Sequence, residues 1–372
     1  MSFKNIGPFE SFQASPFRHH LYRENWVPGL TGSREKSLLQ DLHIPTVTVE
    51  DQSMEKSKKH KCLICISLSW IWDLEHMEEF KLVFGRTLRE RIPRWKDHLP
   101  EISFSTTITA EELGLPRVQL SKRMVPTDFR FEDQRMHAIA GALYEYSKLW
   151  QVDNVVEFEQ VFLDCVECHY HAFNDGKVLH RDLSENDLMF KRKGGEVKGI
   201  LNDWDMASSL NAINKVQNST AKHRTGTLPF MARELLVDKT PPTHLYRHDL
   251  ESFFYILVWA VVHYDLKKKK HLPVAKPLRD WDDNGSVSKG RNAKSAFIND
   301  GDVAKEVLEH ALPEFQETVS KWVMPMLRLF VRAIASKRDN GHDEGYDLET
   351  CGGTLTFQTF MGALNRVPRQ LV

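Results

Sequence analysis

The sequence predicts an α+β fold in two parts, a small N-terminal part with β-strands and a larger, mainly helical C-terminal part. Three observations support this prediction. The chain has 372 residues, of which 41% are hydrophobic and 27% charged, as in a globular protein large enough for two lobes. Strand-like runs rich in Val, Ile and Thr occur before residue 202. Apolar and amphipathic helical runs dominate after residue 232.

The composition limits the classes of partner and compartment. A formal net charge of −1 gives no electrostatic reason to expect nucleic acid or an anionic membrane as a partner. The N-terminus has no basic segment followed by an apolar run, and the most apolar run, Phe253–Val262, is too short to span a bilayer. Five cysteines fit a reducing compartment. We therefore expect an intracellular protein, cytoplasmic or nuclear, and the composition predicts no particular oligomeric state.

Two C-x-x-C pairs have the spacing of zinc ligands, Cys62–Cys65 and Cys165–Cys168. The first pair lies in a strand-like run, where residues three apart point to opposite faces. The second pair lies in an amphipathic helical run and shares its face with apolar neighbours. Because cysteine is commonly a small buried residue, the pattern favours core thiols, with a structural zinc site as the alternative.

The first 145 residues contain few clear elements. The predicted ones are, in order, a strand at Thr46–Val49, a strand at Cys62–Trp70 and a helix at Asp73–Arg91. Pro93 and Pro100 bracket a predicted loop, and a polar connection extends from there to about Phe131. The periodicity of Met136–Leu143 fits either a strand or a buried helical turn.

The middle of the chain has a clearer pattern. A helix is predicted at Asn154–Phe173, with Asn154 as its N-cap and residues 174–176 as its stop. A short strand at Val178–His180 follows, and then a β-hairpin whose strands are Leu188–Lys191 and Val197–Leu201.

The C-terminal part is predicted to be helical. Its helices are expected at Arg233–Val237, Asp249–Tyr264, Val303–Leu312 and Glu314–Ser336. Residues 267–295 are predicted to form a loop, and the four lysines at 267–270 a solvated face.

Three acidic motifs occur in a fixed order along the middle of the chain. They are His180-Arg181-Asp182, then Asp203-Trp204-Asp205 directly after the hairpin, then Ala232-Arg233-Glu234 at the end of RTGTLPFMARE. Phosphoryl transfer needs one carboxylate that orients the attacking hydroxyl and oxygen ligands that hold magnesium on the phosphates. A loop Asp beside a hairpin that ends in a second Asp supplies both, so the ordered set predicts a phosphotransferase fold.

The segments VLHRDLSENDLMF, GILNDWDMA, RTGTLPFMARELL and RHDLESFFYILVWA resemble those of the fungal-type protein kinase family. The resemblance is strong over about residues 150–265 and thinner on either side. It implies a two-lobed protein-kinase-like fold, with an irregular extension at 1–58, a divergent N-lobe at 59–145, and a C-lobe with catalytic loop and activation segment at 146–372. It also implies ATP and Mg²⁺ as cofactors and a protein as substrate.

The resemblance implies a role for eight residues. Asp182 would be the catalytic base, and Asp203 and Asp187 would bind the nucleotide through magnesium as its first and second ligands. His180 would be structural, and Arg181 would contact the activation segment. The remaining three roles belong to Thr227, which would position the substrate hydroxyl, Glu234, which would anchor the end of the segment, and Asp249, which would hold the catalytic loop. Candidate phosphorylation sites are Ser219, Thr220 and Thr225.

The sequence departs from the kinase pattern at three places. Asp187 stands where kinases have Asn, which adds a negative charge beside the phosphates. Gly29 and Gly32 do not make a Gly-rich loop. The strand CLICISLSW lacks the phosphate-binding lysine, although Lys59 and Lys61 stand just before it.

These departures leave alternatives for the function. The favoured hypothesis is an ATP-dependent protein serine/threonine kinase, because both aspartates and the whole activation-segment pattern are present. The alternative is a catalytically impaired pseudokinase that acts as a binding or scaffolding module. A small-molecule phosphotransferase is disfavoured by GTLPFMARE, which resembles a peptide-substrate platform.

Overall fold

The computed structural model describes residues 81–101, 104–109, 136–141, 146–214, 226–237, 241–282 and 286–369. The chain divides into two units, Met1–Ile64 and Cys65–Val372, and every described residue belongs to the second. The strands predicted at Thr46–Val49 and Cys62–Trp70 lie outside the described residues, as does the first part of the predicted helix Asp73–Arg91.

The described N-terminal elements are short. They are helix α2 (Lys81–Arg91), the 3₁₀ helix η3 (Pro93–His98), and the antiparallel strands β1 (Phe104–Thr109) and β2 (Met136–Gly141). The region predicted as strand or helical turn is thus a strand. Strand β1 and helix η3 differ from the loop and polar connection predicted there. The β1 sequence FSTTIT is mostly hydroxyl-bearing, but its Thr and Ile residues are β-branched and favour a strand.

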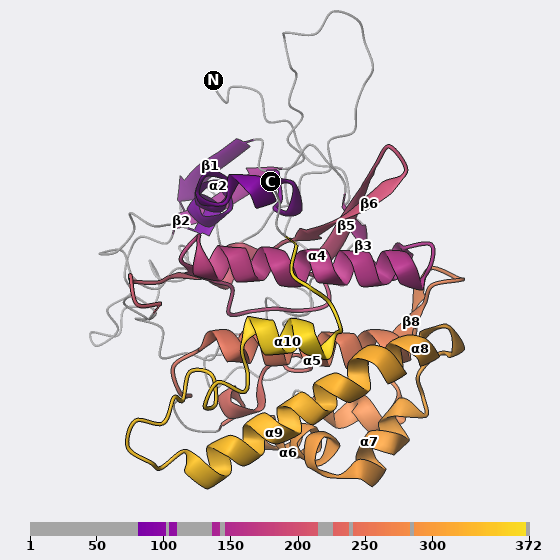
Figure 1. Ribbon diagram of the computed structural model, residues 1–372. Helices are drawn as coiled ribbons and strands as arrows, with labels where there is room; N and C mark the ends of the chain where they lie inside the picture. Colours follow the sequence, from indigo (N-terminus) through magenta and orange to yellow (C-terminus); the bar gives the residue numbers. More distant parts are fainter. Residues whose placement is uncertain are drawn as a thin grey trace, which may run out of the picture. The chain divides into compact units, whose positions relative to one another are not determined.

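Helix α4 (Val155–Asn174) confirms the predicted helix and ends one residue later than the predicted Phe173. The Asn154 side chain accepts a hydrogen bond from the Glu157 backbone N–H (3.0 Å), which confirms the predicted N-cap. The apolar face of α4 is fully buried and includes Cys165 and Cys168. Helix α4 contacts both strands of the hairpin that follows residues 180–187, and in Figure 1 this hairpin rises at an angle from α4.

The predicted hairpin is confirmed and is longer than expected. Its strands are β5 (Leu188–Lys193) and β6 (Glu196–Leu201), and the short strand β3 (Ser147–Lys148) pairs with β5 to give the order β3-β5-β6. The turn consists of Gly194 and Gly195, whose positive φ angles of 62° and 87° favour glycine.

Helix α5 (Tyr246–His263) is the centre of the C-terminal part. It begins three residues earlier than predicted, and its apolar run Phe253–Val262 is buried, which confirms the expected core helix. Among the residues that the structure describes, no helix has the length and apolar character needed to cross a membrane.

Other helices surround α5. They are η6 (Arg233–Leu235), η7 (Lys276–Trp281), α6 (Val287–Asn299), α7 (Gly301–Leu308), η8 (Pro313–Phe315), α8 (Gln316–Thr318), a π-helical turn (Val319–Val323), α9 (Met324–Asn340) and α10 (Phe357–Ala363). The predicted helix at Glu314–Ser336 is therefore interrupted near its start. Helices α9 and α10 contact each other, as Figure 1 shows.

The prediction of a loop at residues 267–295 is wrong. This stretch contains strand β9 (Lys270–His271), η7 and most of α6, and β9 pairs with β8 (Tyr264–Asp265). Helix α6 has the sequence VSKGRNAKSAFIN, whose few apolar residues give no helical period. Three of the predicted solvated lysines, Lys267, Lys268 and Lys269, are exposed and form ion pairs.

Gly199 in β6 allows the hairpin to pack closely on α4. A Cβ atom at this position would lie 2.6 Å from both the Asp164 Cβ and the Val161 carbonyl oxygen. The Gly199 N–H donates to Asp164 Oδ2 (2.7 Å). We expect Gly199→Ala to lower the free energy of unfolding by about 1–3 kcal/mol, because a buried backbone must shift.

Urea unfolding of Gly199→Ala would measure this loss. The matched control is Gly362→Ala in α10, where an added Cβ meets nothing within 4 Å. Alanine favours a helix over glycine by up to about 1 kcal/mol, so the control should be as stable as the natural chain or more stable. Equal effects of the two substitutions would contradict the packing explanation.

Three buried histidines should make the fold sensitive to mild acid. Burial lowers the pKa of His180, His248 and His263 to about 4. His263 is bonded only as the neutral ring, since its Nδ1–H donates to the Trp259 oxygen and its Nε2 accepts from the Ala275 N–H, both at 2.9 Å. An unfolded histidine takes up its proton near pH 6.5. The free energy of unfolding should therefore fall as the pH is lowered from 6.5 to about 4.

Urea unfolding at several pH values would test this slope. His263→Gln should reduce the pH dependence of the free energy of unfolding by the equivalent of up to one bound proton. Substitution of the exposed His310 by Gln should leave this pH dependence unchanged. His271 has the opposite effect on the pH dependence of stability. Burial lowers its pKa, but the hydrogen bond to Glu185 outweighs burial and raises the pKa above its ordinary value. A stability that does not change between pH 6.5 and 4.5 would mean that the three buried rings are not kept neutral.

Candidate active site

The catalytic loop connects two strands that fix its ends. It runs from His180 to Asp187, between β4 (Val178–Leu179) and β5. Strand β4 pairs with β7 (Ser208–Ser209), which follows the D-W-D motif, so this pairing brings the two motifs together. Arg181 and Asp203 have positive φ angles of 72° and 56°, and such backbone strain in non-glycine residues concentrates at functional sites.

His180 ties the loop to the turn before Asp203. Its Nε2 donates to the carbonyl oxygen of Asn202 (2.9 Å), and its ring centroid lies 4.7 Å from that of Trp204. Because the ring is fully buried and neutral, this contact is a fixed structural bond rather than a proton carrier.

Asp249 binds the start of the catalytic loop from α5. Its carboxylate is fully buried and accepts hydrogen bonds from His169 Nε2 (2.8 Å), His244 Nε2 (2.6 Å) and the backbone N–H of Arg181 (3.2 Å). Burial alone would raise its pKa, but the two histidines outweigh this and hold the pKa well below its usual range. The Arg181 guanidinium donates to Ser208 Oγ (2.5 Å), early in the segment after D-W-D.

The three predicted catalytic aspartates interact electrostatically. Asp182 is half-buried, Asp203 is exposed, and Asp187 is buried with one carboxylate oxygen accepting the Ser184 N–H (2.7 Å). Burial raises the pKa of Asp187 well above its ordinary value, and the charges of Asp203 and Asp182 raise it further. The backbone carbonyl of Asp187 also accepts the Asn202 N–H (2.9 Å), which links the loop to the D-W-D turn.

The neighbouring Asn186 is held differently. Its backbone carbonyl accepts a hydrogen bond from Lys148 Nζ (3.2 Å), and its N–H contacts the Ser184 hydroxyl (3.3 Å). The charges of Asp182 and Asp203 act on Asp187, and its part in binding a metal stays a prediction.

The three aspartates offer carboxylate oxygens, the donor type that a hard divalent cation prefers. The charges of Asp203 and Asp182 raise the pKa of Asp187, and a bound magnesium ion would offset those charges. A carboxylate at 187 has two oxygens, so it can accept the Ser184 bond and still offer an oxygen to the ion. Within the described ranges, no group of three or more His, Cys, Asp or Glu side chains is arranged so that it could hold a metal ion.

Thr227 lies next to Asp182 of the loop. Its hydroxyl donates to Asp182 Oδ1 at 3.4 Å, a long bond that places the two residues next to each other. Gly226, just before it, has a φ of +134° and lies against Met231, since an added Cβ would approach the Met231 Cε to 2.7 Å. The segment thus turns sharply where it reaches the catalytic loop.

Glu234 anchors the other end of this segment. Its carboxylate accepts two bonds from the Arg247 guanidinium (2.8 and 2.7 Å) and one from Lys337 Nζ (2.6 Å). Burial would raise its pKa, but the interactions with His248, Arg247 and Lys337 outweigh it and hold the pKa well below its usual range. Glu234 therefore joins the segment to both α5 and α9.

The structure thus brings together all eight predicted site residues in two neighbouring groups, the loop with its aspartates and the anchored segment. Four of their partners are not predicted from the sequence: His169, His244, Arg247 and Lys337. Arg247 could have been found as part of the R-H-D motif in the first turn of α5, whereas Lys337 is 103 residues from Glu234 and belongs to no local pattern. The candidate phosphorylation sites and the strand without lysine lie outside the described residues.

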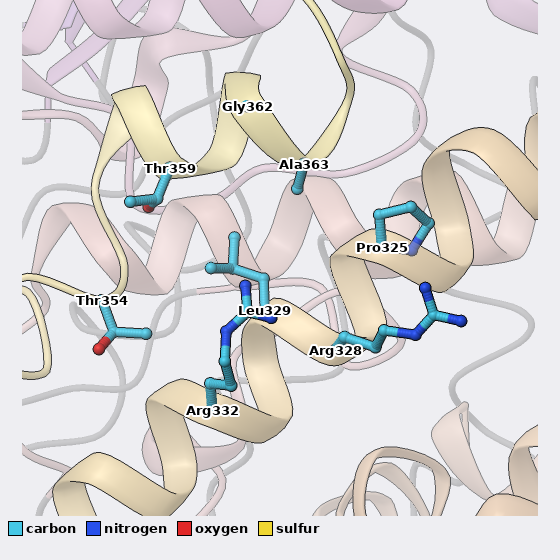
Figure 2. A pocket seen from close by; sticks show the side chains of 8 residues that line it. All are labelled: Pro325, Arg328, Leu329, Arg332, Thr354, Thr359, Gly362 and Ala363. Atoms are coloured by element: carbon cyan, nitrogen blue, oxygen red, sulfur yellow. The ribbon is translucent and has the colours of Figure 1, made fainter.

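A groove of about 430 Å³ lies between α9 and α10 and shares no residue with this site (Figure 2). It is lined by Pro325, Arg328, Leu329, Arg332, Thr354, Thr359, Gly362 and Ala363.

The order of these parts is that of the protein-kinase class: an H-R-D loop, a hairpin, a D-x-D turn and a segment that ends in A-x-E before a buried helix. A comparison with protein families matches residues 32–261 to the family described as fungal protein kinase. The match covers more than half of the chain, and the protein belongs to this family. No curated protein of significantly similar sequence was found.

The charge of Asp187 should reduce stability in the absence of a cation. A buried carboxylate with a raised pKa binds a proton more readily in the folded state, so it costs stability at pH 7. We expect Asp187→Asn to raise the melting temperature without magnesium by about 2–4 °C and to reduce the further increase that millimolar MgCl₂ produces.

A thermal melt with and without MgCl₂ would measure both effects. The control is Asp280→Asn, which removes an exposed carboxylate of η7 and should change neither value. A lower melting temperature for Asp187→Asn without magnesium would show that the Asp187 charge is already neutralised by another group.

Proposed function

We propose that the protein is an ATP-dependent protein serine/threonine kinase of the fungal type, which transfers the γ-phosphoryl group of Mg-ATP to a protein hydroxyl. The observation that carries the proposal is the position of Asp182. It lies beside Thr227 of the anchored segment and interacts electrostatically with Asp187, which in turn interacts with Asp203. One loop therefore faces both a substrate platform and a set of oxygen donors for a cation.

In this mechanism Asp182 is the base. Its carboxylate would orient the serine or threonine hydroxyl of the substrate and accept its proton as the oxygen attacks the γ-phosphorus in line. The bond from that phosphorus to the bridging oxygen of the β-phosphate would break, and ADP would leave. Thr227, within hydrogen-bond distance of Asp182, would fix the carboxylate and the incoming hydroxyl relative to each other. Asp203 and Asp187 would hold magnesium, which when bound neutralises charge on the phosphates.

The support for this mechanism is the rigidity of the parts that carry it. Asp249 bonds the backbone of Arg181, next to Asp182, and His180 bonds the backbone of Asn202, next to Asp203. Both of these supporting side chains are fully buried. Positioning of this kind is the main contribution that a protein makes to phosphoryl transfer.

The second candidate is a pseudokinase that binds a partner without phosphoryl transfer. It is favoured by the segment CLICISLSW, predicted from the sequence as a strand, which lacks a lysine, and by the third carboxylate at 187, which repels phosphate unless a cation is bound.

Phosphate incorporation from radiolabelled ATP into the protein itself and into dephosphorylated casein would test the proposal. We expect Mg-dependent labelling, and a loss of about 100-fold or more for Asp182→Asn, because general base catalysis contributes at least that factor. Asp203→Asn should lose labelling to a similar extent, and the exposed control Asp280→Asn should not.

Thermal melts with Mg-ATP separate the two candidates. A ligand that binds only the folded state raises the melting temperature. Binding without labelling would support the pseudokinase with a nucleotide site. The absence of both ATP binding at millimolar concentration and labelling would contradict the kinase proposal and would favour a scaffold.

A further inference from the structure

Lys294 of α6 is a fully buried lysine that contacts the segment beside the active site. Its Nζ donates to the backbone carbonyl oxygens of Leu228 and Met231, both at 2.7 Å. The same ammonium lies 4.6 Å from the centroid of the Tyr255 ring and 5.7 Å from that of Trp281. Its three N–H groups are therefore accounted for by two carbonyls and an aromatic face.

Burying an ammonium group raises the free energy of the folded state, unless hydrogen bonds within the protein replace those that the group made with water. Among the described residues, no carboxylate lies within ion-pair distance of Lys294. Burial lowers the pKa of its amino group well below the ordinary value, and Glu251 and Arg233 shift that pKa in opposite directions. The two carbonyls are then its main compensation. A methionine would fill the same space without a charge, but it would leave both carbonyls without this donor.

The two carbonyls belong to a tight turn that begins at Thr227. The Thr227 carbonyl oxygen accepts the N–H groups of Phe230 (2.9 Å) and Met231 (3.0 Å). The Phe230 ring packs edge-on against Trp259 of α5 (5.6 Å). Lys294 bonds the turn on both sides of Phe230, and the first residue of the turn contacts Asp182.

The apolar packing beneath the segment is limited. Four of its buried residues form a small cluster separate from the main core: Met231, Ala232, Leu235 and Leu236. Partly buried Leu228 and Val287 pack against it. Only Phe230 of the turn belongs to the main core. The position of the turn therefore depends on its polar bonds more than on burial, and Lys294 supplies two of them.

We propose that Lys294 is a positioning residue for the protein substrate: from α6 it sets the backbone of residues 227–231, and so the affinity for the substrate polypeptide but not for the nucleotide. This proposal rests on the proposed kinase function. Its physical part, the clamp on the turn, does not depend on activity and can be measured separately.

Amide hydrogen exchange tests the clamp. In Lys294→Met, exchange in residues 227–231 should be about tenfold faster, while the amides of α5 and α9 remain protected. Lys294→Gln keeps one donor group, so its exchange rate in these residues should lie between those of Lys294→Met and the natural chain. The control is Lys305→Met in α7, an exposed lysine that pairs with Glu309. It should exchange like the natural chain.

Steady-state kinetics with dephosphorylated casein tests the consequence. The KM for casein should rise about tenfold in Lys294→Met and less in Lys294→Gln, while the KM for ATP stays within about twofold. A purely structural role would lower kcat and affect both KM values alike.

The outcomes separate the two proposals. Unchanged exchange in residues 227–231 of the folded Lys294→Met or Lys294→Gln chain would overturn the clamp. Faster exchange with equal losses in kcat and both KM values would overturn the assignment to substrate affinity. If the natural chain labels neither itself nor casein, the kinase function fails, and the exchange result alone decides whether Lys294 holds the turn.

Discussion

The buried carboxylate of Asp249 is the interaction on which the site depends. It accepts hydrogen bonds from α4 through His169, from the chain before α5 through His244, and from the catalytic loop through the Arg181 N–H. A buried charge of this kind is stable only when each donor is in place, so the three segments are fixed relative to one another. The left-handed backbone at Arg181 persists because this bond holds it.

The opposite pKa shifts of two aspartates describe the site. Burial would raise the pKa of both carboxyl groups, but Asp249 has two histidine partners that lower its pKa, whereas Asp187 has two neighbouring carboxylates that raise it further. The scaffold carboxylate is thus compensated within the chain. The carboxylate at the proposed metal position is compensated only when a cation or a proton is added.

The sequence predicts the parts of this site that depend on local patterns. The N-cap Asn154, the glycine turn of the hairpin and the order of the H-R-D and D-W-D motifs each act within a few residues, so they appear in the sequence. Helix α6 is missed because its buried side includes a glycine and Lys294 in place of apolar residues. Likewise, the Lys337–Glu234 contact joins residues that are 103 positions apart, and no local sequence pattern predicts it.

The substrate side of the site differs from the metal side in how it is completed. The segment that carries Thr227 is held at one end by Lys294 and at the other by Glu234, whose carboxylate is bonded by Arg247 and Lys337. These bonds are satisfied by the chain itself, so the platform is formed before any ligand arrives. At the proposed metal position, by contrast, the charges of Asp203 and Asp182 raise the pKa of the buried Asp187, and among the described residues no cationic side chain offsets them in that shift. In the proposed reaction, binding of the magnesium nucleotide is then the step that completes the site, since the platform for the protein is already in place.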